Sequence, residues 1–401
     1  MSLAPAPVLR EESPAVSPRT SISHSAARWA ASTFFLLDGI AFGTWAALIP
    51  TFKQHFGVTD AGLSQALLGM VVGCVISMPL AGNLIARFGS QRVAVAGAIT
   101  VCLVLPLLAL APSFGLFVAA ASLFGAFKGA LDVGVNVQAI TVENAVRRPI
   151  NSSFQALWSL GGLIAAFLAS LCIKHGVSSI LLTTSVAAAL LLCVALTSGR
   201  LMPDPVSERT PPTGFQWPNP TLRWLGFLAF MALFAEGVMM DWGAVYARSV
   251  AGASESVAPL AYAVFCFSMA TGRLIGDWAI RKMTPTRVFR LTGILMMAGL
   301  CILIFVPVWP ATFAGLLVAG LAISNWVPIL FVAAGRAHES GAGPGMATVT
   351  TIGYFGFLAG PPMIGALSAA AGLPHAMMVV LVFGAVISTF GVTVLRRQLA
   401  G

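Results

Sequence analysis

The sequence is dominated by long apolar stretches that follow one another along almost its whole length. A helix needs about 20 apolar residues to cross the hydrocarbon core of a bilayer. Twelve stretches meet this requirement, which predicts an all-α polytopic membrane protein with twelve transmembrane helices. The predicted spans are 29–51, 60–85, 93–111, 113–142, 153–173, 177–199, 221–247, 256–280, 288–308, 310–335, 345–370 and 373–395.

The composition supports the same fold class. Of the 401 residues, 58% are hydrophobic and 9% are charged, whereas about 25% of the residues of soluble domains are charged. Too little polar surface remains for a water-soluble globule, which excludes soluble enzymes, nucleic-acid binders and secreted disulfide scaffolds. The six cysteines lie in apolar stretches without a CxxC pair. We therefore expect buried, free thiols and neither a disulfide framework nor a zinc site.

The basic residues indicate which loops face the cytoplasm, because cytoplasmic loops are enriched in Lys and Arg. With the N-terminus inside, seventeen of the 22 basic residues fall in cytoplasmic segments. Only Lys53, Lys174 and Arg248 fall outside, while Lys128 and Arg273 lie within spans. The net charge of +9 is thus explained by topology rather than by binding to nucleic acid. We expect a multi-pass protein of the cell inner membrane with both termini in the cytoplasm.

The twelve spans divide into two halves of six. Residues 200–220 form the longest polar interruption, and their prolines and charges indicate a cytoplasmic linker. We expect an N-terminal half at 29–199 and a C-terminal half at 221–395. Residues 1–28 and 396–401 are the expected cytoplasmic tails, the first of them disordered because it is rich in Ser, Pro and Arg.

Motifs repeat at matching positions of the two halves. The loop GNLIARFGSQRV after span 2 corresponds to GDWAIRKMTPTRV after span 8, and QALWSLGGL in span 5 corresponds to TIGYFGFL in span 11. Two repeated halves are typical of transporters that rock about a binding site at the interface between the halves.

Ionisable residues inside the spans point most directly to function, because a charge at the bilayer centre costs about 2.5–3.5 kcal/mol. Span 4 carries Lys128, Asp132 and Asn136, which are spaced by four and share one helical face. Asp132 lies about 15 Å deep by helical rise. Lys128 can pair with Asp132, and a proton or a substrate could compete for that pair. The alternative is a buried ion pair that only holds helices together.

Two further spans carry acidic residues. Asp38 lies about 13 Å into span 1, where it could simply accept a hydrogen bond from a neighbouring helix. Glu236 in span 7 is a candidate substrate ligand. Asp241 lies closer to the outer interface, where it could bond Trp242 or Tyr246 instead.

Other residues complete the candidate substrate site. Asn325 precedes Trp326 and Pro328, a pattern that predicts a locally broken helix beside a cavity or packed protein. Asn325, Trp158 and Tyr354 are candidate substrate ligands, the two aromatic rings by stacking on a sugar. Packing or anchoring at the interface is the alternative for the rings.

Motifs for other chemistry are missing from the sequence. We find no GxxxxGK[ST] loop, no HExxH and no GxSxG. We therefore expect no enzyme activity, no ATP drive, no cofactor and no metal.

The loop after span 2 resembles a signature of the major facilitator superfamily, Gly-x-Leu-x-Asp-Arg-x-Gly. Gly82, Arg87 and Gly89 fit this pattern, but Ala86 stands at the position of the acid. The resemblance implies a gating motif here that lacks its usual ion pair between the halves.

The second copy of this gating motif follows span 8. It retains its acid, Asp277, with Arg281 four residues later on the same helical face.

Longer segments resemble the fucose-permease-like branch of bacterial facilitators, which includes a rhizopine-cluster membrane protein. These segments are GALDVGVNVQAITVE (129–143), RRPINSSFQALWSLGGL (147–163), AEGVMMDWGAVYAR (235–248) and YFGFLAGPPMIG (354–365). Leu131, Asp132 and Asn136 match the span-4 pattern Leu-Glu-x-x-x-Asn of that branch, so the resemblance implies that Asp132 couples protons. The branch's second acid is replaced by Ala46, and Asp38 two turns earlier could take its place.

Together these features predict a secondary active transporter, proton-coupled and working by alternating access. The resemblance favours a sugar or a cyclitol such as a rhizopine-like compound as its small-molecule substrate. We expect a monomer in the lipid bilayer, with protons as the coupling ion and no nucleic-acid partner. The alternatives are proton-driven efflux of amphipathic compounds and a non-transporting membrane sensor, although a sensor would be expected to carry a soluble output domain.

Overall fold

The computed structural model describes residues 23–147, 150–203, 220–337 and 342–399, and within these ranges the regular structure is entirely helical. Among these described residues, twelve helices or helix pairs are long and apolar enough to span a membrane, which confirms the predicted fold class. The first half contains α1 (His24–Phe56), α2 (Asp60–Phe88), α3 (Ser90–Leu110), α4 (Phe114–Val146), α5 (Asn151–Lys174), α6 (Ser179–Thr197) and the 3-10 turn η1 (Ser198–Arg200).

The second half contains α7 (Pro220–Ser249), α8 (Pro259–Met283), α9 (Pro285–Phe305), α10 (Trp309–Ile323), α11 (Trp326–Ala337), α12 (Ala342–Ala371), α13 (Leu373–Val386), the π-helical turn η2 (Ile387–Gly391) and α14 (Val392–Leu399). The first span begins earlier than predicted, because α1 starts at His24. Most of the predicted N-terminal tail and linker lie outside the described residues.

Hydroxyl side chains set where several helices begin. Ser23, Thr59, Ser113 and Ser178 precede α1, α2, α4 and α6, and each side-chain oxygen accepts a hydrogen bond from the backbone N–H three residues later at 3.2–3.4 Å. These bonds satisfy N–H groups that have no partner within the first helical turn.

Two spans are interrupted. The tenth breaks between Ile323 and Trp326, as the sequence predicts, so that α10 and α11 together cross the bundle. The twelfth contains the π-helical turn η2, which the sequence did not indicate. Such turns insert an extra residue into a helix and are frequent at functional sites.

Helix packing repeats between the halves. α1 packs along α5 as α7 packs along α12, and α2 packs along α4 as α8 packs along α10. The loops repeat too, because Gly89 (φ 85°, ψ 154°) and Thr284 (φ 87°, ψ 148°) adopt the same backbone conformation between α2 and α3 and between α8 and α9. The repeat is therefore present in both the packing and the turns.

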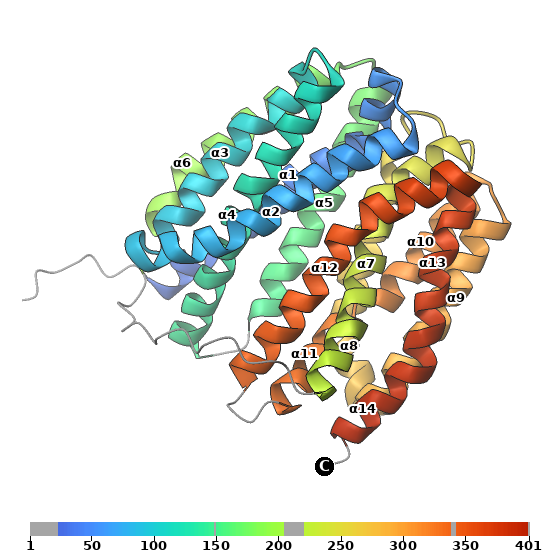
Figure 1. Cartoon of the computed structure of the whole chain (residues 1–401). Helices are drawn as coiled ribbons and strands as arrows, with labels where there is room; N and C mark the ends of the chain where they lie inside the picture. Colours follow the sequence, from blue (N-terminus) through green and yellow to red (C-terminus); the bar gives the residue numbers. More distant parts are fainter. Residues whose placement is uncertain (1–22, 148–149, 204–219, 338–341, 400–401) are drawn as a thin grey trace, which may run out of the picture.

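The two halves meet chiefly along two helix pairs, α5 with α8 and α2 with α12, and α1 also contacts α7 and α8. Figure 1 shows the first six helices on one side of the bundle and the later helices on the other, with α2 beside α12. At the end where α2 begins, Asp60 pairs with Lys53 of α1 and accepts a hydrogen bond from Ser368 of α12 at 2.5 Å. A Cβ on Gly365 would lie 2.5 Å from the Ser64 side chain, so the halves touch closely here.

The cysteines are only partly as predicted. All six are free, but Cys102 and Cys266 alone are buried, and Cys301 is exposed on α9. In a membrane protein the outer surface of a span faces lipid, so an apolar residue does not need to lie inside.

Candidate functional site

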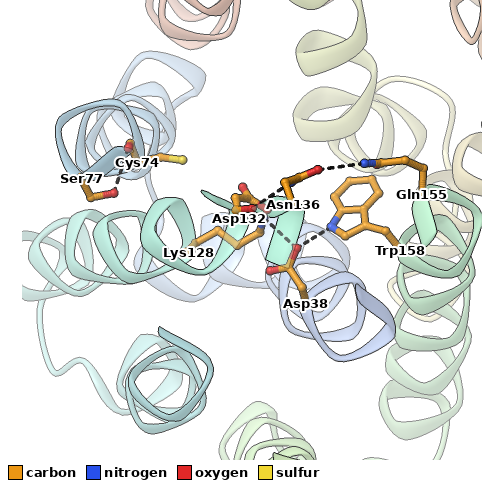
Figure 2. A network of polar contacts seen from close by, with 8 residues as sticks. All are labelled: Asp38, Cys74, Ser77, Lys128, Asp132, Asn136, Gln155 and Trp158. Carbon is orange, nitrogen blue, oxygen red and sulfur yellow. Dashed lines mark hydrogen bonds and ion pairs between the residues drawn. The ribbon is translucent and has the colours of Figure 1, made fainter. Parts of the chain in front are cut away.

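The predicted face of α4 forms the centre of a charged cluster. The Lys128 Nζ lies 2.6 Å from Asp132 Oδ1, and the Asn136 side-chain amide donates to the Asp132 backbone carbonyl at 2.8 Å. The spacing of four therefore brings these residues together, as the sequence predicts. Figure 2 shows them in a row along the helix.

Lys128 also binds a second carboxylate, from another helix. Its Nζ lies 3.1 Å from Oδ2 of Asp38 in α1. The side chains of Asp38 and Lys128 are 1% and 4% exposed, whereas that of Asp132 is 27% exposed. One ammonium group thus lies between two carboxylates, and one of these carboxylates keeps access to open space.

Trp158 of α5 holds Asp38 from the other side. Its indole N–H donates to Asp38 Oδ2 at 2.8 Å. The Lys128 ammonium lies 5.7 Å from the centre of the Phe42 ring and 5.8 Å from that of the Trp158 ring, within reach of cation–π attraction. Trp158 is a candidate for stacking on a substrate, and in the structure its polar edge binds the charged cluster (Figure 2).

Close packing of α1 on α5 makes the Trp158 contact possible. A Cβ on Gly39, next to Asp38, would lie 2.0 Å from the Trp158 carbonyl oxygen. Only glycine allows the two helices to approach this closely, so Gly39 positions the indole against the carboxylate.

Asn136 is tied to α5 as well as to Asp132. The Gln155 side-chain amide donates to Asn136 Oδ1 at 3.3 Å, as drawn in Figure 2. Gln155 lies one turn before Trp158, so α5 contacts the α4 face twice. Gln155 is not among the site residues predicted from the sequence, although its position in the repeated segment QALWSLGGL is a usable signal.

The second half contributes a separate ion pair that contacts the first half. Arg273 Nη2 of α8 lies 3.3 Å from Glu236 Oε1 of α7, and Arg273 Nη1 donates to Ser159 Oγ of α5 at 3.5 Å. The sequence predicts Glu236 as a site residue, whereas it places Arg273 within a span without indicating a role for it. Its signal was the same as that of Lys128, a basic residue in a stretch where basic residues are costly.

Asn325 packs at a helix contact. Its side-chain amide donates to the Gly272 carbonyl of α8 and to the Ser324 hydroxyl, both at 2.9 Å. A Cβ on Gly276 would lie 1.8 Å from Asn325 Oδ1. These contacts place Asn325 between α8 and α10, where its side chain binds the protein at the break in span 10.

The other candidates in the second half differ in their surroundings. The half-buried Tyr354 of α12 packs against Phe357, with ring centres 6.0 Å apart. Asp241 bonds neither of the partners considered for it. The Tyr246 hydroxyl donates to Leu303, and the Trp242 indole N–H has no hydrogen-bond partner among the described residues.

The gating motif forms no ion pair within the described part of the chain. Arg87 is exposed and lies 5.9 Å above the ring of Phe88. Gly82 lies within the last two turns of α2, and Gly89 directly follows the helix. Arg281 is exposed at the end of α8, and the side chain of Asp277 lies outside the described residues.

The chain matches known families over most of its length. The profile described as "Major Facilitator Superfamily" matches residues 30–343. The chain is 34% identical to an uncharacterized MFS-type transporter of Yersinia pestis, in an alignment that covers 82% of this chain and 86% of that protein. It is 30% identical to membrane protein MosC of Rhizobium meliloti, over 88% of this chain and 86% of that protein.

Solved structures share the fold at low sequence identity. An inward-facing bacterial homologue of the human lysosomal transporter Spinster has a TM-score of 0.74 and 15% identity, with 94% of this chain and 98% of that chain covered. The nucleoside transporter NupG has a TM-score of 0.72 and 13% identity, with 93% and 99% covered. The E. coli fucose:proton symporter FucP has a TM-score of 0.62 and 19% identity, with 94% and 99% covered.

Proposed function

Because the chain belongs to the major facilitator superfamily, we propose that it is a proton-coupled secondary transporter of a small polar metabolite such as a sugar or a cyclitol. The observation that carries this proposal is the cluster of Asp38, Lys128 and Asp132. Charged groups at this depth are costly in a membrane protein and mark ion and substrate pathways.

The charges of the cluster explain how it would bind a proton. Two carboxylates share one ammonium group, so the fully ionised cluster carries a net charge of −1 in a poorly polarisable environment. Binding one proton makes the cluster neutral and frees Lys128 from one of its two partners. Asp132 and Asp38 are therefore the proposed proton-coupling residues.

The neighbouring groups suit a polyhydroxy substrate. Asp132 is partly exposed, and Asn136 and Gln155 extend the polar face beside it. Carboxylate and amide groups accept from and donate to hydroxyl groups. The names of two proteins with this fold, a fucose:proton symporter and a nucleoside transporter, are in keeping with a substrate of this kind.

The two-half architecture supports the proposal of alternating access. The halves touch through α2 and α12 near Asp60 and Ser368, and rocking one half against the other would open this end and close the opposite one. Substrate and proton would be exchanged at the cluster between these two states.

The test is uptake into proteoliposomes of labelled fucose, myo-inositol, glucosamine and glucuronate, with and without an imposed pH gradient. We expect the gradient to drive accumulation of at least one neutral or amino compound by the wild type. Asp132→Asn should lose gradient-driven accumulation but retain exchange of labelled for unlabelled substrate. The matched control is Glu255→Gln in the loop between α7 and α8, which should behave as wild type.

Two outcomes contradict the proposal. Asp132→Asn that still concentrates its substrate under the gradient would show that this residue does not couple protons. Extrusion of amphipathic dyes, with no uptake of any of the four compounds, would favour the efflux alternative.

A further inference from the structure

The ion pair in the second half is only partly satisfied by the protein. A guanidinium group has five N–H donors, and the described contacts of Arg273 use two of its nitrogens, Nη2 to Glu236 and Nη1 to Ser159. Both contacts are long, at 3.3 and 3.5 Å, whereas strong charge-assisted bonds of arginine are about 2.7–2.9 Å and often bidentate. Arg273 therefore has donors to spare.

In each half, the two side chains of an ion pair differ in how much of their surface is exposed. In the first half Lys128 is 4% exposed and Asp132 is 27% exposed. In the second half Glu236 is 10% exposed and Arg273 is 25% exposed. In each half a buried charged residue thus holds a partly exposed one of opposite sign.

The two clusters are connected through adjacent residues. Trp158 binds Asp38 of the first cluster, and Ser159 accepts from Arg273 of the second. The partly exposed carboxylate and the partly exposed guanidinium therefore belong to one region between the halves.

We propose that Arg273 is the substrate-binding residue of the second half, acting opposite Asp132. This inference rests on the proposed transport function and deepens it. Arg273 donates to hydroxyl or ring oxygens of the substrate, while a hydroxyl or ammonium group of the substrate donates to Asp132. Glu236 is a positioning residue that holds the guanidinium.

The charge balance defines the substrate class. Asp38, Asp132 and Glu236 carry three negative charges, and Lys128 and Arg273 carry two positive ones. An anionic substrate would add to this negative excess before the coupling proton binds, and would restore it afterwards, in a region of low polarity where like charges repel strongly. The substrate is therefore a neutral or cationic polyhydroxy compound and not a sugar acid.

Substrate binding at Arg273 also changes a contact between the halves. The Ser159 hydroxyl belongs to α5 of the first half and receives its bond from α8 of the second. A substrate oxygen that takes over the Nη1 donor releases Ser159. Occupancy of the site thus loosens one contact along α5 and α8, which is a surface that must move when the halves rock.

The experiment measures uptake kinetics of fucose, myo-inositol, glucosamine and glucuronate for wild type, Arg273→Gln and Arg273→Lys. For the transported compound, Arg273→Gln should raise KM about ten- to hundredfold, with the maximal rate and the pH-gradient dependence retained. Arg273→Lys keeps the charge but not the planar group, so its KM should be intermediate. Arg248→Gln is the matched control, because Arg248 caps the Ala253 carbonyl outside the spans and should leave KM unchanged.

A charge-swapped double variant, Glu236→Arg with Arg273→Glu, separates binding from structure. If the pair only holds α7 to α8, the swap restores wild-type KM and overturns the inference. If Arg273 binds substrate, KM stays high in the swapped variant.

A wild-type KM in Arg273→Gln also overturns the Arg273 assignment while leaving the proposed function intact. Efficient uptake of glucuronate overturns the stated substrate class, and wild type that moves none of the four compounds overturns both this class and the proposed function. If Arg273→Gln does not fold, Arg273→Lys and the swap decide the question.

Discussion

Trp158 and Ser159 are consecutive residues of α5 that bind charged residues on opposite sides of the boundary between the halves. The Trp158 indole N–H donates to Asp38 of α1 at 2.8 Å, and the Ser159 hydroxyl accepts from Arg273 of α8 at 3.5 Å. The first contact stays within one half and is short, whereas the second crosses to the other half and is long. A rocking motion can therefore break the Ser159 contact without disturbing Asp38.

Replacing Trp158 by Phe tests the contact with Asp38. This change keeps most of the ring but removes the N–H, which leaves a buried carboxylate without one of its donors and should destabilise the protein by about 1–3 kcal/mol. Thermal unfolding of the purified protein in detergent measures the effect.

Trp45 offers a matched control for this substitution. It is buried in α1, and its indole N–H has no hydrogen-bond partner among the described residues. Trp45→Phe also removes an indole N–H, but without breaking a hydrogen bond. The unfolding temperature of this variant should therefore fall less than that of Trp158→Phe. Equal losses would mean that ring volume, not the hydrogen bond, accounts for the effect.

Replacing Lys128 by Met removes the only cation bonded to Asp38 and Asp132 among the described residues. Loss of one partner from a buried ion pair costs about 3–5 kcal/mol, because the remaining charge is left uncompensated. We expect a lower unfolding temperature that is partly restored when Asp38→Asn is added, since the second change removes the stranded charge. A double variant less stable than Lys128→Met would show that Asp38 is not charged in this cluster.

Much of this arrangement could be predicted from sequence because it depends on local spacing. Twelve apolar stretches give twelve spans, and residues four apart on α4 meet on one face. The break in span 10 was also predictable, because Pro328 follows Asn325 so closely. Each of these features needs knowledge of one helix only.

The contacts that were missed join helices distant in the sequence. Asp38 and Lys128 are ninety residues apart, and which turn of α1 faces α4 depends on how closely Gly39 lets α5 approach. The Arg273–Ser159 bond crosses between the halves, and no periodicity within either helix specifies it. Apolar spans carry little directional pattern, because lipid and protein interior are both apolar.

The turns between α2 and α3 and between α8 and α9 allow a test of the repeat. Thr284 adopts φ 87°, ψ 148°, a region that is populated almost only by glycine and is strained for other residues by about 1–3 kcal/mol. Thr284→Gly should therefore raise the unfolding temperature, and Gly89→Thr in the corresponding turn should lower it. Effects in the opposite direction would mean that the Thr284 side chain stabilises its turn by more than the strain.

The contact of Asp60 with Ser368 and Lys53 predicts how the equilibrium between conformations responds to a single change. Asp60→Asn removes the ion pair with Lys53 and weakens the acceptor for the Ser368 hydroxyl, so the contact between α2 and α12 loses part of its stabilisation. The population with this end open should increase about five- to tenfold, because the lost interactions amount to about 1–1.5 kcal/mol.

Spin labels on cysteines at Gln54 and His375, in a background without the six natural cysteines, report the separation of the two halves at this end. Both positions are exposed, one at the end of α1 and the other at the start of α13. We expect longer distances in Asp60→Asn and an unchanged distribution in Glu255→Gln, which alters an acid in the loop between α7 and α8 and leaves α2 and α12 unchanged. An unchanged distribution in Asp60→Asn would show that the close packing of Gly365 on Ser64 holds this end closed without the charged contact.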